Sequence, residues 1–346
     1  MCESVENFVF SALFSLKKSI QISFSLIYLL CRRKGFMCFK KKEVKKIPVI
    51  INCDTGIDDA VALMIAIKSE KLDIKLITTD VGNVSTEQAA KNCLNVLELV
   101  GAEDIPVCAG EGKCLERERK RVAVHGETGM GEYVFPEHSR RITEGDAVEK
   151  IYETLMASDE KVTIICLSPP TNIAKLILKH KDCHEKIERI VFMAGTIEDV
   201  EKGEMPYPEF NVSCDPEAGE VLMNSKIPIE IVPMEMGHTA YLDWQEVFKT
   251  KNTNFVGSVF EIIFRSYKDR HVKNGIATHD GCAIAYVTNP ELFEIVNVYG
   301  EVKYFDSINS GVMTMNFGKK PNAKTCVIMD IPAFKKLYFK LLKKCK

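Results

Sequence analysis

The stretch IPVIINCDTGIDDAVALMIAIKS (residues 47–69) joins an apolar run to an amphipathic run through a turn that contains three aspartates. Residues 47–53 are rich in β-branched side chains and predict a buried strand. Over residues 58–69 the apolar side chains recur at helical spacing, and this predicts a helix. A buried strand that leads directly into a helix is the repeating unit of a parallel sheet covered on both faces.

The same alternation continues along the chain. Apolar runs predict further strands at 72–79, 105–109, 162–167, 187–194 and 227–233, and helices are expected at 86–100, 171–180 and 216–224. No internal repeat or low-complexity linker divides residues 47–346. We therefore predict one α/β domain with a mostly parallel central sheet flanked by helices. In such a sheet the ligand crevice lies at the carboxyl ends of the strands.

Composition limits the class of protein. The 346 residues include 46% hydrophobic side chains, enough for the core of one large domain. With 46 basic and 48 acidic residues, the chain lacks the cationic surplus that nucleic-acid binding requires, so no nucleic-acid partner is expected. Its 13 cysteines form no paired CxxC spacing, which argues against a zinc site or a disulfide framework. Reduced thiols of this kind are typical of a cytoplasmic protein.

Residues 1–46 lack this alternation, and we expect them to lie outside the fold. They contain two apolar runs, 8–16 and 20–31, and neither is long enough to cross a bilayer alone. Basic residues follow the second run, as in a membrane anchor or a surface-lying segment. Membrane contact through residues 8–31 is one interpretation. The other is that Met37 is the true start, so that the native protein lacks residues 1–36.

The three aspartates of the first turn are the strongest chemical signal. Asp54, Asp58 and Asp59 crowd the end of the first strand, although one carboxylate is enough to cap a helix. Their mutual repulsion is usually compensated by a hard cation with oxygen ligands. A haloacid dehalogenase phosphatase would need an aspartate nucleophile at position 52, but this chain has Asn52, whose amide cannot form an aspartyl phosphate.

Polar motifs also follow the later strands. They are DVGN at 80–83, HGETGM at 125–130, SPPTNIA at 168–174, EFNV at 209–212 and THDG at 278–281. The carboxyl ends of parallel strands meet at one edge of the sheet, so we expect these motifs to gather there with the aspartates.

In this order, from about residue 48 to the C-terminal strand and helix, the motifs resemble those of the nucleoside hydrolase family: DxDxGxDDA, GN, HGxxGL, PLTNIA, EFN and HDP. The resemblance implies calcium-dependent hydrolysis of the N-glycosidic bond of ribonucleosides to free base and ribose, in nucleoside salvage, by a homodimer or homotetramer. Purine and pyrimidine preference both remain open. A catalytically silent nucleoside-binding protein is the alternative, although such a protein need not keep the complete set of acidic residues.

The resemblance also implies a role for individual residues. Calcium would be bound by the carboxylates of Asp54, Asp59 and Asp280 and by the main-chain carbonyl of Thr171. Asp54 would also be the general base for the attacking water, and His279 would protonate or position the leaving base. The remaining substrate contacts are assigned to Asp58, Asn83, His125, Met193, Glu209, Asn211 and Tyr267.

Four departures from the family pattern stand out. Asn52 replaces the usual first aspartate, and we expect this to weaken the support of the metal. Thr55 replaces a proline, and so does Gly281, both with mild consequences. The asparagine expected upstream of Glu209 aligns with residues 203–204, a glycine and a glutamate, so one sugar contact is missing or supplied differently.

Overall fold

Strand β1 (Ile47–Cys53) lies near the middle of a nine-stranded sheet of order β10-β9-β11-β6-β5-β4-β1-β2-β3. The computed structural model describes residues 45–102, 104–118, 125–131, 133–197, 208–250, 255–268, 275–303 and 311–345, with only the backbone for 255–256 and 266–268. The other strands are β2 (Leu72–Thr79), β3 (Val107–Ala109), β4 (Val162–Cys166), β5 (Ile187–Met193), β6 (Ile229–Val232), β9 (Phe293–Lys303), β10 (Val312–Asn316) and β11 (Ala323–Met329).

The strands from β3 across to β11 pair in parallel, whereas β9 is antiparallel to both β11 and β10. The prediction of a mostly parallel α/β sheet is confirmed, and the six predicted strands agree with β1 to β6 within about two residues at each end. A separate two-stranded sheet is formed by β7 (Leu242–Asp243) and β8 (Gly275–Ile276), which are antiparallel.

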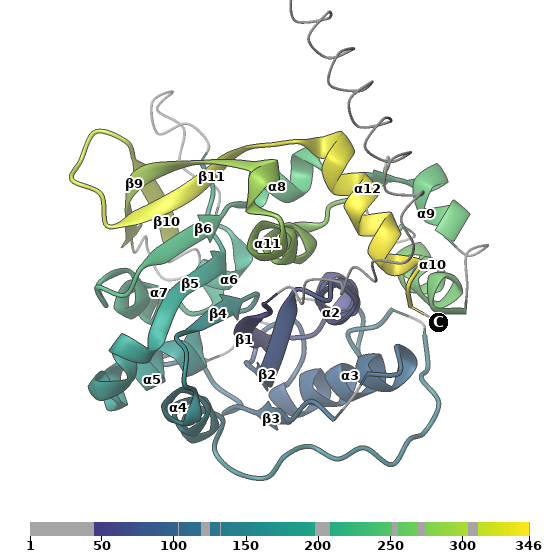
Figure 1. Ribbon diagram of the computed structural model, residues 1–346, viewed down its shortest axis with the longest axis horizontal. Helices are drawn as coiled ribbons and strands as arrows, with labels where there is room; N and C mark the ends of the chain where they lie inside the picture. Colours follow the sequence, from purple (N-terminus) through teal and green to yellow (C-terminus); the bar gives the residue numbers. More distant parts are fainter. Residues whose placement is uncertain are drawn as a thin grey trace, which may run out of the picture. The chain divides into compact units, whose positions relative to one another are not determined.

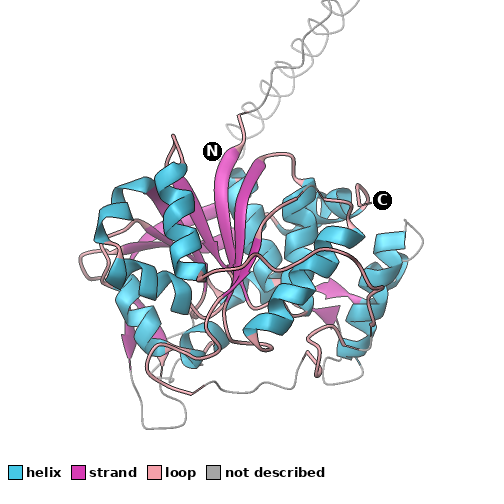
Figure 2. Cartoon of the chain, turned by 90° about the horizontal axis from the view of Figure 1, so that it is seen from below, coloured by secondary structure: helices cyan, strands magenta, loops and turns pink. Residues whose placement is uncertain are grey.

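Helices cover both faces of the sheet, as Figures 1 and 2 show. Side chains of β1 alternate between two cores: Val49, Ile51 and Cys53 belong to one, and Ile50 to the other. The first core includes helices α2 (Ile57–Lys68), α3 (Thr86–Leu99), α10 (Phe255–Lys268), α11 (His279–Thr288) and α12 (Ile331–Leu342). The second includes α4 (Ala147–Ala157), α5 (Thr171–Lys179) and α7 (Pro216–Met223).

Shorter helices complete the described chain. They are α6 (Phe210–Cys214), α8 (Met234–Thr239), α9 (Trp244–Thr250) and the 3-10 helices η1 (Lys181–Lys186) and η3 (Pro290–Leu292). None of the helices in the described ranges is both long and apolar enough to cross a membrane.

The order of the strands places a crevice beside β1. From β1 the chain proceeds through β2 to β3 on one side, and it then returns to β4, on the other side of β1, and continues to β5 and β6. Ligands of open α/β sheets bind at such a reversal, outside the carboxyl ends of the strands. Asp54 directly follows β1, and the loop 167–170 directly follows β4, so both predicted motifs border this crevice.

The predicted extension, residues 1–46, lies outside the described residues except for Lys45 and Lys46, and its separation from the fold remains a prediction. Because β1 begins at Ile47, we expect a protein of residues 37–346 to be soluble. Its melting temperature should stay within about 2 °C of that of the full chain, which for a domain of this size corresponds to a change in stability of about 1 kcal/mol. Thermal unfolding of both proteins checks this expectation, and an insoluble shorter protein would contradict it.

Candidate active site

Three carboxylates meet where helices α2 and α11 begin. Asp58 and Asp59 lie in the first turn of α2, and Asp280 lies in the first turn of α11. Oxygen atoms of the three side chains lie within 4.8 Å of one another. Asp59 and Asp280 are buried, whereas Asp58 is half-buried. These three carboxylates could therefore hold a metal ion together. They come from two of the predicted motifs, the aspartate cluster after β1 and THDG at 278–281.

Asp54 is held beside this group by the loop that follows β2. Its Oδ2 accepts a hydrogen bond from the main-chain N–H of Asn83 (2.6 Å), and its Oδ1 accepts one from the Asn83 side-chain amide (3.2 Å). The same amide donates to Oδ2 of Asp59 (3.2 Å). A Cβ on Gly82 would lie 1.9 Å from Oδ2 of Asp54, so only glycine lets this loop approach the carboxylate so closely.

Burial makes negative charge costly in this cluster. It raises the pKa of Asp54 to about 7, and the Asp58 carboxylate acts in the same direction, while the hydrogen bond from Asn83 opposes it. Burial and the neighbouring aspartates raise the pKa values of Asp59 and Asp280 well above the ordinary range. A bound cation is the usual means of keeping such crowded carboxylates ionised.

His279 begins α11, beside Asp280. Burial lowers its pKa to about 4, an effect opposed by the Asp58 carboxylate and reinforced by the ring of His238. The His238 ring meets the His279 ring edge-on, with centroids 5.0 Å apart. At neutral pH the imidazole of His279 is therefore uncharged in this environment. His238 matches none of the motifs in the sequence, and only its packing from α8 reveals that it lies next to the site.

Glu209, Asn211 and Met193 lie together at the ends of β4 and β5. The Glu209 carboxylate accepts hydrogen bonds from the main-chain N–H groups of Asn211, Val212 and Gly195, at 2.8, 3.2 and 3.1 Å. Burial raises the pKa of Glu209 to about 7. The Asn211 amide nitrogen donates to the carbonyls of Leu167 (3.1 Å) and Met193 (3.0 Å). These residues thus join two strand ends and a helix, in addition to any role toward a ligand.

His125 reaches the site from a loop that is 68 residues away in the sequence from the turn it contacts. The main-chain N–H of Ile57 donates to its Nδ1 (3.1 Å), which places the imidazole against the turn that carries the aspartates. Tyr267 lies in α10 by its backbone, and its side chain lies outside the described residues.

Thr171 is the first residue of α5 and is buried. Its hydroxyl donates to Oδ2 of Asp215 (2.5 Å), and this carboxylate also accepts from the main-chain N–H of Leu115 (2.7 Å). The beginning of α5 is thereby fixed to the loop around Leu115, at the crevice beside β1.

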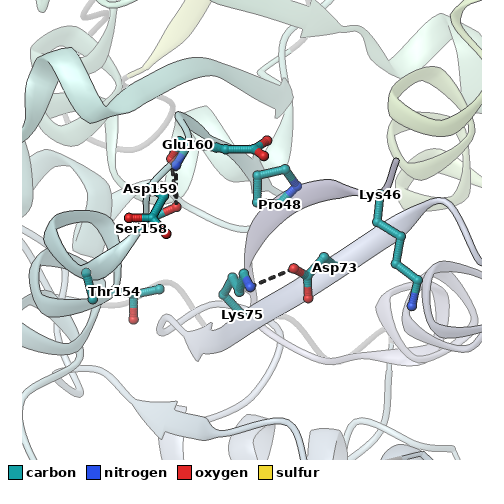
Figure 3. Close-up of a pocket in the computed structure, with 9 residues that line it drawn as sticks. Lys46, Pro48, Asp73, Lys75, Thr154, Ser158, Asp159 and Glu160 are labelled. Atoms are coloured by element: carbon teal, nitrogen blue, oxygen red, sulfur yellow. Dashed lines mark hydrogen bonds and ion pairs between the residues drawn. The ribbon is translucent and has the colours of Figure 1, made fainter. Parts of the chain in front are cut away.

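A surface pocket lies at the opposite end of the strands (Figure 3). It is lined by Lys46 and Pro48, which border the start of β1, and by Asp73 and Lys75 of β2, whose side chains form an ion pair of 2.6 Å. The acidic cluster follows the carboxyl end of β1. The pocket is therefore separate from the candidate active site.

The fold and this site define a class, the nucleoside hydrolases, which are N-glycosidases. The family model for inosine-uridine preferring nucleoside hydrolases matches residues 49–336, and the chain belongs to this family. The match spans every described site residue from Asp54 to Asp280.

Curated relatives share both length and sequence. The pyrimidine-specific ribonucleoside hydrolase RihA of Salmonella paratyphi B is 34% identical over 299 residues, which cover 83% of this chain and 96% of the relative. The non-specific ribonucleoside hydrolase RihC of Escherichia fergusonii is 33% identical over 305 residues, covering 86% of this chain and 99% of the relative.

Solved structures confirm the fold. The plant nucleoside hydrolase PpNRh1 superposes with a TM-score of 0.78 at 26% identity and covers 86% of this chain and 99% of its own. An inosine-guanosine nucleoside hydrolase gives a TM-score of 0.78 at 25% identity, over 85% of this chain and 98% of its own. Together with the curated relatives, they make the chain a hydrolase of N-glycosidic bonds.

Proposed function

We propose that this protein is a calcium-dependent ribonucleoside hydrolase that releases free base and ribose. The observation that carries the proposal is the meeting of Asp58, Asp59 and Asp280 within 4.8 Å, with Asp54 hydrogen-bonded beside them. The relatives include pyrimidine-specific and non-specific ribonucleoside hydrolases, so we infer that pyrimidine ribonucleosides are among the substrates. A role in nucleoside salvage, an oligomeric assembly and a cytoplasmic location remain predictions.

The donor set suits calcium. We propose that the carboxylates of Asp54, Asp59 and Asp280 and the main-chain carbonyl of Thr171 hold the ion, because calcium prefers hard oxygen ligands and accepts many of them. Zinc would favour histidine or cysteine ligands. The raised pKa values of Asp59 and Asp280 support a cation at this site, because burial and the neighbouring aspartates disfavour the charged forms of these carboxylates.

Cleavage of the N-glycosidic bond places positive charge on the sugar, and the chain offers suitable groups. We assign Asp54 as the general base that removes a proton from the attacking water, because Asn83 fixes both of its oxygens in position. The anionic cluster stabilises the oxocarbenium-like transition state. When bound, calcium would keep these carboxylates ionised, orient the ribose hydroxyls and increase the acidity of the water.

We assign different residues around the acidic cluster to the sugar and to the leaving base. Asp58, the half-buried carboxylate, and Asn83 would bind the ribose hydroxyls, and Met193, Glu209 and Asn211 would contact the rest of the sugar. His279 and His125 would face the base, and Tyr267 would be a further contact to the substrate. Because the pKa of His279 lies at about 4, its imidazole is uncharged at neutral pH. We therefore expect it first to position the base by a hydrogen bond and only then to transfer a proton.

Removal of the cation tests this proposal. Exhaustive chelation should reduce ribose release from uridine and inosine by at least about 10³-fold, because general base, metal and ribose orientation fail together. The melting temperature should fall as well, since binding stabilises only the folded protein. Addition of calcium should restore both quantities. A metal-free sample that keeps its activity would contradict the proposal, and a calcium-binding sample that never releases ribose would indicate the silent nucleoside-binding alternative.

A further inference from the structure

Asn52, the main departure from the family pattern, lies at the centre of a buried polar network. Its amide nitrogen donates to Oδ2 of Asp80 (2.7 Å) and to the hydroxyl of Ser168 (2.8 Å). Its carbonyl oxygen accepts from the Thr78 hydroxyl (2.7 Å) and the Asn172 amide (3.1 Å). All five side chains are buried. The side-chain amide of Asn52 therefore uses both its donors and its acceptor, and it connects β1 to the residues that follow β2 and β4.

Asp80 explains why position 52 is an amide. A carboxylate at position 52 could not donate to Asp80, and two buried carboxylates 2.7 Å apart would have to share a proton. Asparagine has nearly the shape of aspartate and supplies the missing donor. The Asn52–Asp80 pair therefore contains one carboxylate. It belongs to Asp80, directly after β2, whereas the residue from β1 is an amide.

The position of this carboxylate connects it to the proposed metal ligand. Asp80 accepts a hydrogen bond from the main-chain N–H of Asn172, at 3.2 Å from Oδ1 and 3.1 Å from Oδ2. This N–H lies in the first turn of α5, where it has no partner within the helix. It belongs to the same planar peptide group as the carbonyl of Thr171. Burial raises the pKa of Asp80 to about 7, and the hydrogen bonds from Asn52 and Asn172 oppose this by favouring the carboxylate. When ionised, Asp80 places a negative charge on the N–H side, which fixes the direction of that carbonyl and increases the negative charge on its oxygen.

We propose that Asp80 is a positioning residue that orients and polarises the Thr171–Asn172 peptide group for cation binding, and that Asn52 is the matching partner that orients Asp80. This inference rests on the proposed function, because Thr171 is a ligand only if the site binds calcium. It assigns a role in the site to Asp80, the first residue of the DVGN motif, which the family resemblance leaves without a role.

Calcium titration of Asp80→Asn tests the polarising charge. This change keeps the shape of the side chain and a hydrogen-bond acceptor but removes the charge. We expect isothermal titration calorimetry with calcium alone to show a Kd about 10–100-fold weaker than that of the wild-type protein, while kcat at saturating calcium changes much less. A merely structural role would lower the melting temperature of the metal-free protein and leave the calcium Kd unchanged.

A double-mutant cycle tests the pairing of Asn52 with Asp80. Without calcium, Asn52→Asp should lower the melting temperature by about 5 °C or more, because it places two carboxylates in contact. The double variant N52D/D80N should recover most of this loss, whereas N52D/D215N should not, although Asp215 is also a buried carboxylate near the start of α5. The double variant N52D/D80N should still bind calcium as weakly as Asp80→Asn, because the Asn172 N–H again faces a neutral group.

The outcomes are distinguishable. If Asp80→Asn bound calcium with the same Kd as the wild-type protein, this inference alone would be overturned. A wild-type Kd in the double variant N52D/D80N would overturn it as well. Additive melting temperatures in the cycle would overturn the pairing of Asn52 with Asp80. A wild-type protein that releases ribose without binding calcium would overturn the proposed cofactor and this inference together.

Discussion

Replacing Asp54 by asparagine is expected to reduce kcat for ribonucleoside cleavage by about 10³-fold or more while the protein stays folded. Loss of a general base alone costs about 10²–10⁴-fold, and this change also weakens a proposed metal ligand. The fold should tolerate the replacement, because asparagine has the same shape and can still accept the hydrogen bond from the Asn83 N–H. Steady-state kinetics with saturating calcium, together with thermal unfolding, measure both effects.

Asp73→Asn is the matched control for this experiment. Asp73 is a partly exposed aspartate of the neighbouring strand β2, paired with Lys75 at the opposite end of the sheet, so its replacement should leave kcat unchanged within about twofold. If a folded, calcium-loaded Asp54→Asn protein had near wild-type kcat, Asp54 would not be the base.

Deoxyribonucleosides are expected to be poorer substrates than ribonucleosides by about 10⁴–10⁵-fold in kcat/KM. A site built to bind a hydroxyl rejects an analogue that lacks it, because its buried polar groups are left without partners. Here those groups would be the calcium ion and Asp58, which lies within 4.8 Å of Asp59 and Asp280. The measurement compares uridine with 2′-deoxyuridine, and inosine with 2′-deoxyinosine.

The 5′-deoxyribonucleosides provide an internal control. The Glu209 carboxylate and the Asn211 amide nitrogen already bond to main-chain groups, so they remain satisfied when the 5′ hydroxyl is absent. We therefore expect a smaller loss, about 100-fold at most. Equal kcat/KM values for uridine and 2′-deoxyuridine would contradict the proposed binding of the ribose hydroxyls.

Sequence patterns were sufficient for strands β1 to β6 and for the polar groups that follow them, but not for β9, β10 and β11, which complete the sheet. Strand β1 and helix α2 follow from the apolar spacing of residues 47–69. The motif after β2 contacts Asp54 and the motif after β4 contacts Asn52, because parallel strands end at one edge. The sheet of β7 and β8 was not predicted, since two-residue strands have too little periodicity to be recognised.

Side-chain partners distant in sequence could not be predicted. Asn52 was expected to weaken the site, but its contact with Asp80, 28 residues away, depends on the register of β1 against β2. The EFN motif identifies Glu209 but does not reveal that its carboxylate bonds to three main-chain N–H groups. The proximity of His238 to His279 likewise depends on how α8 packs against α11.

Release of free ribose from a panel of ribonucleosides in phosphate-free buffer with calcium is the most direct measure of the proposed ribonucleoside hydrolase activity. Uridine, cytidine, inosine and adenosine would each be incubated with the full-length protein, and base and ribose would be measured separately. We expect equal amounts of base and ribose from at least one pyrimidine ribonucleoside, and loss of this activity on chelation. A folded, calcium-loaded protein that releases ribose from none of the four would contradict the proposed activity.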